Sequence, residues 1–284
     1  MKYAVTGVTG HFGSVALKEL AQLVPAKDII ALARNVEKAK QMVPEGIEIR
    51  PGDYMQPGDL HNALKGVDRL LLVSSQPGGA LPRIQQHLNV LTAARNEGVR
   101  FIAYTSFPHA DTAKGALAYD HKMTETAIKN TAIQHAFLRN NWYLENELSV
   151  INGAKAGQTV SYSAGDGKVG WTLERFYAEA AAKVLATETP KEVYEFAGPS
   201  HTYQELAAAI ETAIGQKVNV AQVNDDQYQA QLIEAGLDKN VAEALVMIQM
   251  LIREGDLTEA TNDLSEVLGR PLPDLATAIK TLIQ

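Results

Sequence analysis

The sequence contains no cysteine, which excludes disulfide bridges, a thiolate nucleophile and a thiolate metal site. No two of its seven histidines stand four residues apart, so a helical two-histidine site has no support and we expect no metal. No apolar run approaches the roughly 18 residues that span a bilayer. No basic region followed by an apolar stretch opens the chain. We therefore expect a cytoplasmic protein that does not enter a membrane.

Acidic side chains are in modest excess over basic ones. The 284 residues include 26 basic and 33 acidic side chains, for a net charge of −7. This balance argues against a broad nucleic-acid surface, so any recognition of phosphate must be local. Hydrophobic residues make up 46% of the chain and charged residues 21%, which is typical of a globular protein. The length allows one large α/β domain or a nucleotide domain with a small appendage.

The most informative pattern lies in the first fourteen residues. An apolar run over residues 2–6 predicts a strand, three glycines follow at Gly7, Gly10 and Gly13, and helical spacing resumes over residues 15–20. In a dinucleotide-binding unit such glycines permit a tight turn, an approach of the backbone to pyrophosphate, and close packing of helix on strand. The spacing differs from G-x-G-x-x-G, so a purely structural turn remains the alternative.

A second apolar run, residues 29–33, ends at Arg34, about twenty residues past the last glycine, where the ribose-binding residue is expected. An acidic residue there would bind the 2′-hydroxyl, whereas a guanidinium forks onto phosphate oxygens. Arg34 therefore predicts NADP(H) rather than NAD(H), and Lys38 adds positive charge one turn into the next helix. The alternative is an ordinary solvated arginine.

Helices and strands alternate over the first 140 or so residues, which indicates parallel strands joined by right-handed crossovers. Beyond residue 145 the alternation fades into an alanine-rich helix over 173–185, a strand over 192–197 and several amphipathic segments. We predict a Rossmann-type doubly wound α/β fold with a smaller, mostly helical C-terminal region. Residues 1–150 would form the NADP(H)-binding domain, and residues 151–284 a substrate region partly interleaved with the sheet. The apolar helix 241–252 could be part of the core, a pocket lid or a dimer face, and the sequence does not decide among these roles.

Polar residues follow several predicted strands at the carboxyl ends, where open parallel sheets bind ligands. Ser74, Ser75 and Gln76 follow one strand, and an exposed turn is the alternative there. Residues 138–143 end another strand with amides and large rings, for which a structural Trp/Tyr pair is the alternative.

Several stretches together resemble a known family: GVTGHFG at 7–13, ALARN at 31–35, GDY at 52–54, AYTS at 103–106 and LRNNWYLEN at 138–146. They resemble the NmrA-like branch of atypical short-chain dehydrogenases/reductases, and within it the group of bacterial NADPH:quinone oxidoreductase type 2 and triphenylmethane reductase proteins. The resemblance implies a Rossmann domain that holds NADPH and a small C-terminal substrate region. The cofactor-binding residues that it implies are Gly7, Thr9, Gly10, His11, Phe12, Gly13, Arg34, Ser74, Ser75, Gln76, Thr105, Leu138, Arg139, Asn140, Asn141, Trp142 and Tyr143.

One departure from the wider superfamily bears on mechanism, because no Tyr-x-x-x-Lys pair occurs in the sequence. His121 falls at the lysine position and Leu117 at the tyrosine position, which disfavours alcohol dehydrogenation and sugar epimerisation. Quinone reduction tolerates the absence of the Tyr-x-x-x-Lys pair, since hydride addition gives a delocalised phenolate that water can protonate. His121 would bind the nicotinamide ribose or assist protonation, and a partly exposed helix histidine is the alternative.

We therefore expect an NADPH-dependent oxidoreductase that reduces quinones or similar planar acceptors without metal or flavin. Its substrate would stack on Phe107, Trp142, Tyr143 and Trp171. The alternative is a non-catalytic NADP(H)-sensing regulatory protein of the NmrA type, and a dinucleotide-binding subunit of an assembly is a third option. The expected partner is a small quinone-like molecule, with no nucleic acid and no membrane, and a homodimer is left open.

Overall fold

The computed structural model describes residues 1–113 and 115–284, which form two compact units. Unit 1 comprises residues 1–140, 175–196 and 263–269, and unit 2 comprises residues 141–174, 197–262 and 270–284. The chain passes from one unit to the other five times, after residues 140, 174, 196, 262 and 269. Each unit is therefore assembled from three separate segments.

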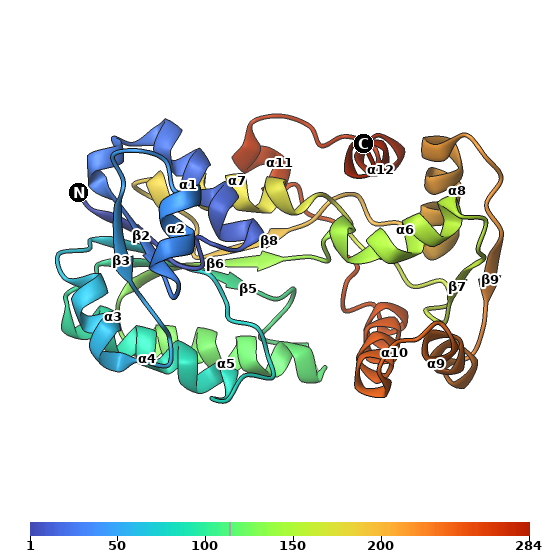
Figure 1. The fold of residues 1–284 in the computed structure, drawn as a ribbon, viewed down its shortest axis with the longest axis horizontal. Coiled ribbons are helices and arrows are strands. Elements are labelled where there is room, and N and C mark those ends of the chain that lie inside the picture. The colour runs from blue at the N-terminus through green and yellow to red at the C-terminus, as the bar shows by residue number, and fades with distance from the viewer. Residues whose placement is uncertain (114) are drawn as a thin grey trace. The chain divides into compact units, whose positions relative to one another are not determined.

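Unit 1 is built on a seven-stranded sheet of order β3-β2-β1-β4-β5-β6-β8, in which every neighbouring pair is parallel (Figure 1). This confirms the predicted Rossmann-type doubly wound fold. The strands are β1 (Tyr3–Val5), β2 (Ile29–Ala33), β3 (Glu48–Pro51), β4 (Arg69–Leu72), β5 (Phe101–Ser106), β6 (Gln134–Asn140) and β8 (Val193–Phe196). The helices are α1 (His11–Leu23), the 3-10 helix η1 (Ala26–Asp28), α2 (Val36–Met42), α3 (Pro57–Leu64), α4 (Arg83–Asn96), α5 (Ala116–Asn130), α7 (Glu174–Ala186) and α11 (Asp263–Leu268).

Both faces of this sheet are covered, which explains why the central strands are buried along their whole length. β2, β4 and β5 are buried at every residue. Leu32, Leu72 and Phe137 belong to a core cluster that also contains residues of α3, α4 and α5. In Figure 1 these three helices lie on one face of the sheet, and α1 and α7 lie on the other.

The order reverses between β1 and β4, because β1 pairs with β2 on one side and with β4 on the other. In doubly wound sheets such a reversal opens a crevice at the carboxyl ends of the strands, where ligands bind. The glycine loop after β1 and the Ser74–Gln76 turn after β4 both lie at this edge. The sheet therefore brings two separately predicted segments to one place.

Unit 2 contains helices around a two-stranded parallel sheet of β7 and β9. Its elements are the 3-10 helix η2 (Leu144–Glu147), α6 (Leu148–Lys155), β7 (Val160–Tyr162), α8 (Tyr203–Ile214), β9 (Val220–Gln222), α9 (Asp225–Glu234), α10 (Lys239–Glu254) and α12 (Leu275–Leu282). In its core, the rings of Tyr162 and Tyr203 stack with centroids 5.3 Å apart, and Trp171 meets Tyr203 edge-on at 5.2 Å. α10 buries Leu251 and Ile252, which makes part of it core, one of the three roles that the sequence left open.

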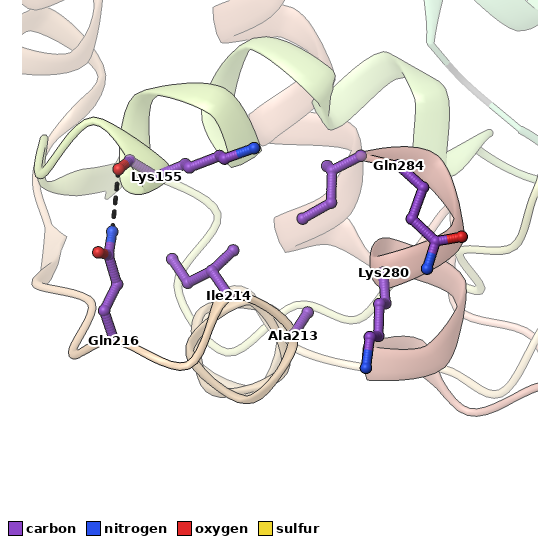
Figure 2. A pocket seen from close by; sticks show the side chains of 7 residues that line it. Lys155, Ala213, Ile214, Gln216, Lys280 and Gln284 are labelled. Atoms are coloured by element: carbon purple, nitrogen blue, oxygen red, sulfur yellow. Dashed lines mark hydrogen bonds between the residues drawn. The ribbon is translucent and has the colours of Figure 1, made fainter.

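A surface pocket of about 440 Å³ lies in unit 2 among α6, α8 and α12. Lys155 and Lys280 border it, and the side chain of Gln216 donates a hydrogen bond to the Lys155 carbonyl across its rim (Figure 2). None of the site residues predicted from the sequence lines this pocket. Among the described residues, no helix combines the length and the apolar character required to cross a bilayer.

Candidate functional site

The three glycines of the first loop differ in what they make possible. Gly7 has a φ of +66°, which L side chains rarely adopt. The N–H of Gly10 donates to the Gly7 carbonyl at 2.9 Å and closes the turn. A Cβ added at Gly13 would lie 2.3 Å from the Gly7 oxygen, so the close packing of α1 on the loop requires glycine. At Gly10 the same distance would be 3.4 Å, so the backbone there is tightly placed but not obstructed.

α1 begins at this loop without a side-chain cap. Gly10 provides no side-chain hydrogen bond, and the first turn contains no acidic residue. His11 is exposed and Phe12 is buried. A helix start of this kind favours an anionic ligand, because backbone N–H groups and the helix dipole both attract phosphate. The geometry fits the pyrophosphate of a dinucleotide.

Two cations stand beside the loop. Arg34 directly follows β2, is exposed, and forms no hydrogen bond or ion pair with any residue that the structure describes. Lys38 donates from Nζ to the Thr9 carbonyl at 3.0 Å, which places its charge on the glycine loop. Asn35 caps α2 by accepting the Lys38 N–H at 2.9 Å. An available guanidinium where NAD-binding proteins carry a carboxylate fits the 2′-phosphate of NADP(H).

The ends of β1 and β4 are joined by a polar cluster that our sequence analysis did not find. Thr6 Oγ1 donates to the Leu71 carbonyl at 3.1 Å and accepts the Val73 N–H at 2.9 Å. The Tyr54 hydroxyl lies 2.5 Å from Thr6 Oγ1 and 2.7 Å from the Val73 carbonyl oxygen. Burial raises the pKa of Tyr54, so the phenol stays neutral. This cluster fixes the floor of the crevice between the two strands.

Two hydrogen bonds from main-chain N–H groups hold the turn after β4. Ser74 donates its N–H to Thr105 Oγ1 at 2.8 Å, which brings together two residues predicted separately from the sequence. Ser75 donates its N–H to Nε2 of the buried His87 at 3.0 Å. Gln76 is exposed. The turn is therefore an ordered part of the crevice edge.

His121 lies on α5 and is only 5% exposed, so the alternative of a partly exposed helix histidine is wrong. Its Nδ1 is 2.9 Å from the Tyr104 hydroxyl, and its ring centroid is 6.0 Å from that of Phe107. Burial, reinforced by the positive charge of Arg83, holds the pKa of His121 well below its ordinary value. The imidazole is therefore neutral at physiological pH and acts as a hydrogen-bonding group rather than as a stored proton.

Arg139, at the end of β6, is surrounded by carboxylates. Its Nε and Nη2 bind the two oxygens of Glu125 at 2.9 and 2.7 Å, and Nη1 binds Glu195 at 2.8 Å and Asp111 at 2.9 Å. Burial alone would lower the pKa of Arg139, but the hydrogen bonds to Glu125 and Glu195 raise it above its usual value. Leu138 is fully buried in the strand, and the Arg139 side chain is already bound to carboxylates. A cofactor contact at either residue remains a prediction, and the main chain would have to make it.

The remaining residues of the predicted 138–143 segment differ in burial and in hydrogen bonding. Asn140 is buried at the end of β6. In unit 2, Asn141 donates from Nδ2 to the Leu257 carbonyl at 3.1 Å and accepts the Trp142 N–H at 2.8 Å. Trp142 and Tyr143 are half-buried, so part of each ring is available to a ligand.

Two predicted substrate rings meet at one buried carboxylate in unit 2. Trp142 and Trp171 donate their indole N–H groups to Glu147 Oε1 at 3.2 and 3.3 Å, and the Tyr203 hydroxyl lies 3.1 Å from the same oxygen. Burial raises the pKa of Glu147, against the effect of these three hydrogen bonds. Trp171 is only 2% exposed, so a stacking role for it is less accessible than for Trp142. Nothing in the spacing of Glu147 along the sequence indicates this arrangement.

The sheet order, the glycine loop and the cations beside it define a dinucleotide-binding protein of the Rossmann class. Comparison with known proteins narrows this class. The model of the NmrA-like family matches residues 2–275. Quinone oxidoreductase 2 of Escherichia coli is 37% identical over 281 residues, with 98% of each chain covered. The chain therefore belongs to the NmrA-like family.

Solved structures agree with this assignment. The crystal structure of an Escherichia coli NADPH-dependent quinone oxidoreductase complexed with NADPH matches with a TM-score of 0.94 at 36% identity, covering 99% of this chain and 100% of the other. The triphenylmethane reductase of a Citrobacter species, complexed with NADP(H), matches with a TM-score of 0.93 at 34% identity, covering 99% of both chains.

Proposed function

We propose that the chain is an NADPH-dependent oxidoreductase that reduces quinones or similar planar acceptors. The full-length similarity to a quinone oxidoreductase and to a triphenylmethane reductase carries this proposal. The available Arg34 guanidinium supports NADPH as the cofactor independently of the relatives. When bound, NADPH supplies the hydride for the reduction.

The residues of the chain would bind and orient rather than exchange protons. The glycine loop and the start of α1 would hold the pyrophosphate, and Arg34 with Lys38 would hold the adenosine phosphate. The neutral His121 would donate or accept a hydrogen bond without changing charge. A quinone requires no strong acid in the protein, since its reduced anion is delocalised and water can protonate it.

Binding of the planar acceptor would rest on the aromatic rings predicted from the sequence. The half-buried Trp142 and Tyr143 would stack on the acceptor and exclude water from it. Phe107 is only 6% exposed, so its part in stacking remains a prediction from the sequence. Trp171 would contribute by holding the Glu147 arrangement in which Trp142 is fixed. Homodimer formation and a cytoplasmic location remain predictions from the sequence.

The test follows the near-ultraviolet absorbance of NADPH with a panel of benzoquinones, naphthoquinones and a triphenylmethane dye, and with a simple ketone as the negative substrate. We expect turnover with planar acceptors and none with the ketone. Gly10→Val is the matched control, because it would block the approach of pyrophosphate while leaving the fold. Tight NADPH binding with no turnover of any acceptor would contradict the proposal and favour the regulatory alternative.

A further inference from the structure

Arg83, the first residue of α4, has a side chain that forms no hydrogen bond or ion pair with the residues that the structure describes. It is half-buried, its Nε is buried without a hydrogen-bond acceptor, and it forms no ion pair with residues 1–113 or 115–284. Burial lowers the pKa of Arg83, yet a guanidinium stays protonated in proteins. Buried arginines normally pair with a carboxylate or phosphate, because withdrawing the charge from water is costly. The absence of such a partner calls for a physical explanation.

The side chains around Arg83 do not neutralise it. His87, four residues further along α4, uses Nε2 to accept the Ser75 N–H, so its proton lies on Nδ1, which is 2.9 Å from Thr124 Oγ1. Burial and the positive charge of Arg83 lower the pKa of His87 to about 3, so this ring is neutral. Tyr104 and Asp120 oppose the burial that lowers the pKa of Arg83, but among the described residues Asp120 forms no ion pair with it.

Arg83 also acts on the residues of the candidate site. Its positive charge lowers the pKa of His121 and opposes the burial that raises the pKa of Tyr104. The Tyr104 ring lies between those of His87 and His121, with centroids 5.6 and 5.8 Å away. Arg83 begins the helix that follows the turn after β4, and His87, one turn further along that helix, accepts the Ser75 N–H of the turn. The start of α4 is thus joined to a predicted part of the candidate site.

We propose that Arg83 binds an anionic oxygen group of a molecule held at the candidate site. This inference rests on the proposed function, and two sources supply the required chemistry. One is a phosphate of the cofactor, and the other is a negatively charged oxygen on the acceptor, either present from the start or formed by its reduction. In both cases the ligand completes an ion pair for which the protein already holds the cation.

The variants are Arg83→Gln, which removes the charge, and Arg83→Lys, which keeps the charge but loses the fork. Arg95→Gln, in the exposed last turn of the same helix, is the matched control. Equilibrium binding of NADPH is measured by its fluorescence. Steady-state kinetics compare an uncharged naphthoquinone with its sulfonate. Thermal unfolding of the unliganded protein is measured in parallel.

If the ligand is a cofactor phosphate, Arg83→Gln weakens NADPH binding roughly 10- to 100-fold and leaves the ratio between the two acceptors unchanged. If it is an oxygen of the acceptor, NADPH binding is unchanged, while kcat/KM falls and the preference for the sulfonate decreases. Arg83→Lys keeps the charge, so in either case the loss that it causes is smaller than that of Arg83→Gln. The Tm of the unliganded Arg83→Gln variant stays equal or rises, since an unpaired charge has been removed.

The inference is overturned if Arg83→Gln behaves like Arg95→Gln in both measurements, or if its main effect is a lower Tm. The binding measurement requires no turnover. A protein that reduces no acceptor would therefore contradict the proposed function and still report on Arg83.

Discussion

Glu147 offers the most informative perturbation, because one oxygen of this buried carboxylate contacts three donors. Glu147→Leu leaves the Trp171 N–H and the Tyr203 hydroxyl, which are 2% and 3% exposed, without an acceptor. Each unsatisfied buried donor costs about 1–3 kcal/mol. The half-buried Trp142 can turn to water. We expect the free energy of unfolding to fall by about 2–6 kcal/mol, the sum over the two buried donors.

Glu147→Gln is the matched control, since it keeps an acceptor oxygen and removes the charge. Burial raises the pKa of Glu147 in the folded protein, so the folded state binds a proton more readily than the unfolded chain. The stabilising contribution is therefore full below the ordinary pKa of about 4.5. It is lost as pH rises from there through the raised folded pKa. Relative to Glu147→Gln, the parent should lose stability across that window.

The assay is urea unfolding followed by circular dichroism at several pH values, with tryptophan emission as a second signal. Trp142 and Trp171 are the two tryptophans of the chain, so its emission reports directly on this cluster. Glu147→Leu should shift the emission, and Glu147→Gln should shift it less. A Leu variant as stable as the parent, or a difference between parent and Gln variant that does not change with pH, would refute the reasoning.

Three further predictions concern unit 1. Arg34→Asp should weaken NADPH binding by roughly 1.5–3 kcal/mol and NADH binding far less; equal losses in a calorimetric titration would exclude a phosphate contact. Gly13→Ala should lower the free energy of unfolding by about 3 kcal/mol or more, because its Cβ meets the Gly7 oxygen, whereas Gly10→Ala should cost less than about 1 kcal/mol. Similar melting temperatures for the two variants would contradict this. Tyr54→Phe should cost about 0.5–1.5 kcal/mol in denaturant unfolding, and an unchanged midpoint would show that its hydroxyl contributes nothing.

The sequence predicts the order of elements in unit 1 well, because each strand is a short apolar run between turn signals. It predicts the start of the first helix less well: helical spacing begins at residue 15, whereas α1 begins at His11, immediately after Gly10. The three-residue strands β7 and β9 escape prediction. They pair residues some sixty positions apart, such as Val160 with Val220, and neither has a strong local pattern.

The sequence predicts the loop residues of the candidate site but not the residues that hold them in place. Gly7, Arg34 and Ser74 stand at strand ends that a reader of the sequence can locate. Two of the three carboxylate partners of Arg139, Glu125 and Glu195, lie 14 and 56 residues away, so the ion cluster becomes visible only when the strands are assembled. Glu147 likewise receives hydrogen bonds from residues 5, 24 and 56 positions away. Contacts of this range have no signature in a single sequence.

The five passages of the chain between its units limit how the protein can be dissected. A fragment truncated after residue 150 would lack β8, so one side of β6 would become an open edge with unsatisfied main-chain groups. It would also lack α7, whose Leu185 carbonyl accepts a hydrogen bond from Arg69. An autonomous nucleotide-binding module cannot be excised with a single cut. Isolating unit 1 from this chain would instead require its three segments to be joined by new connections.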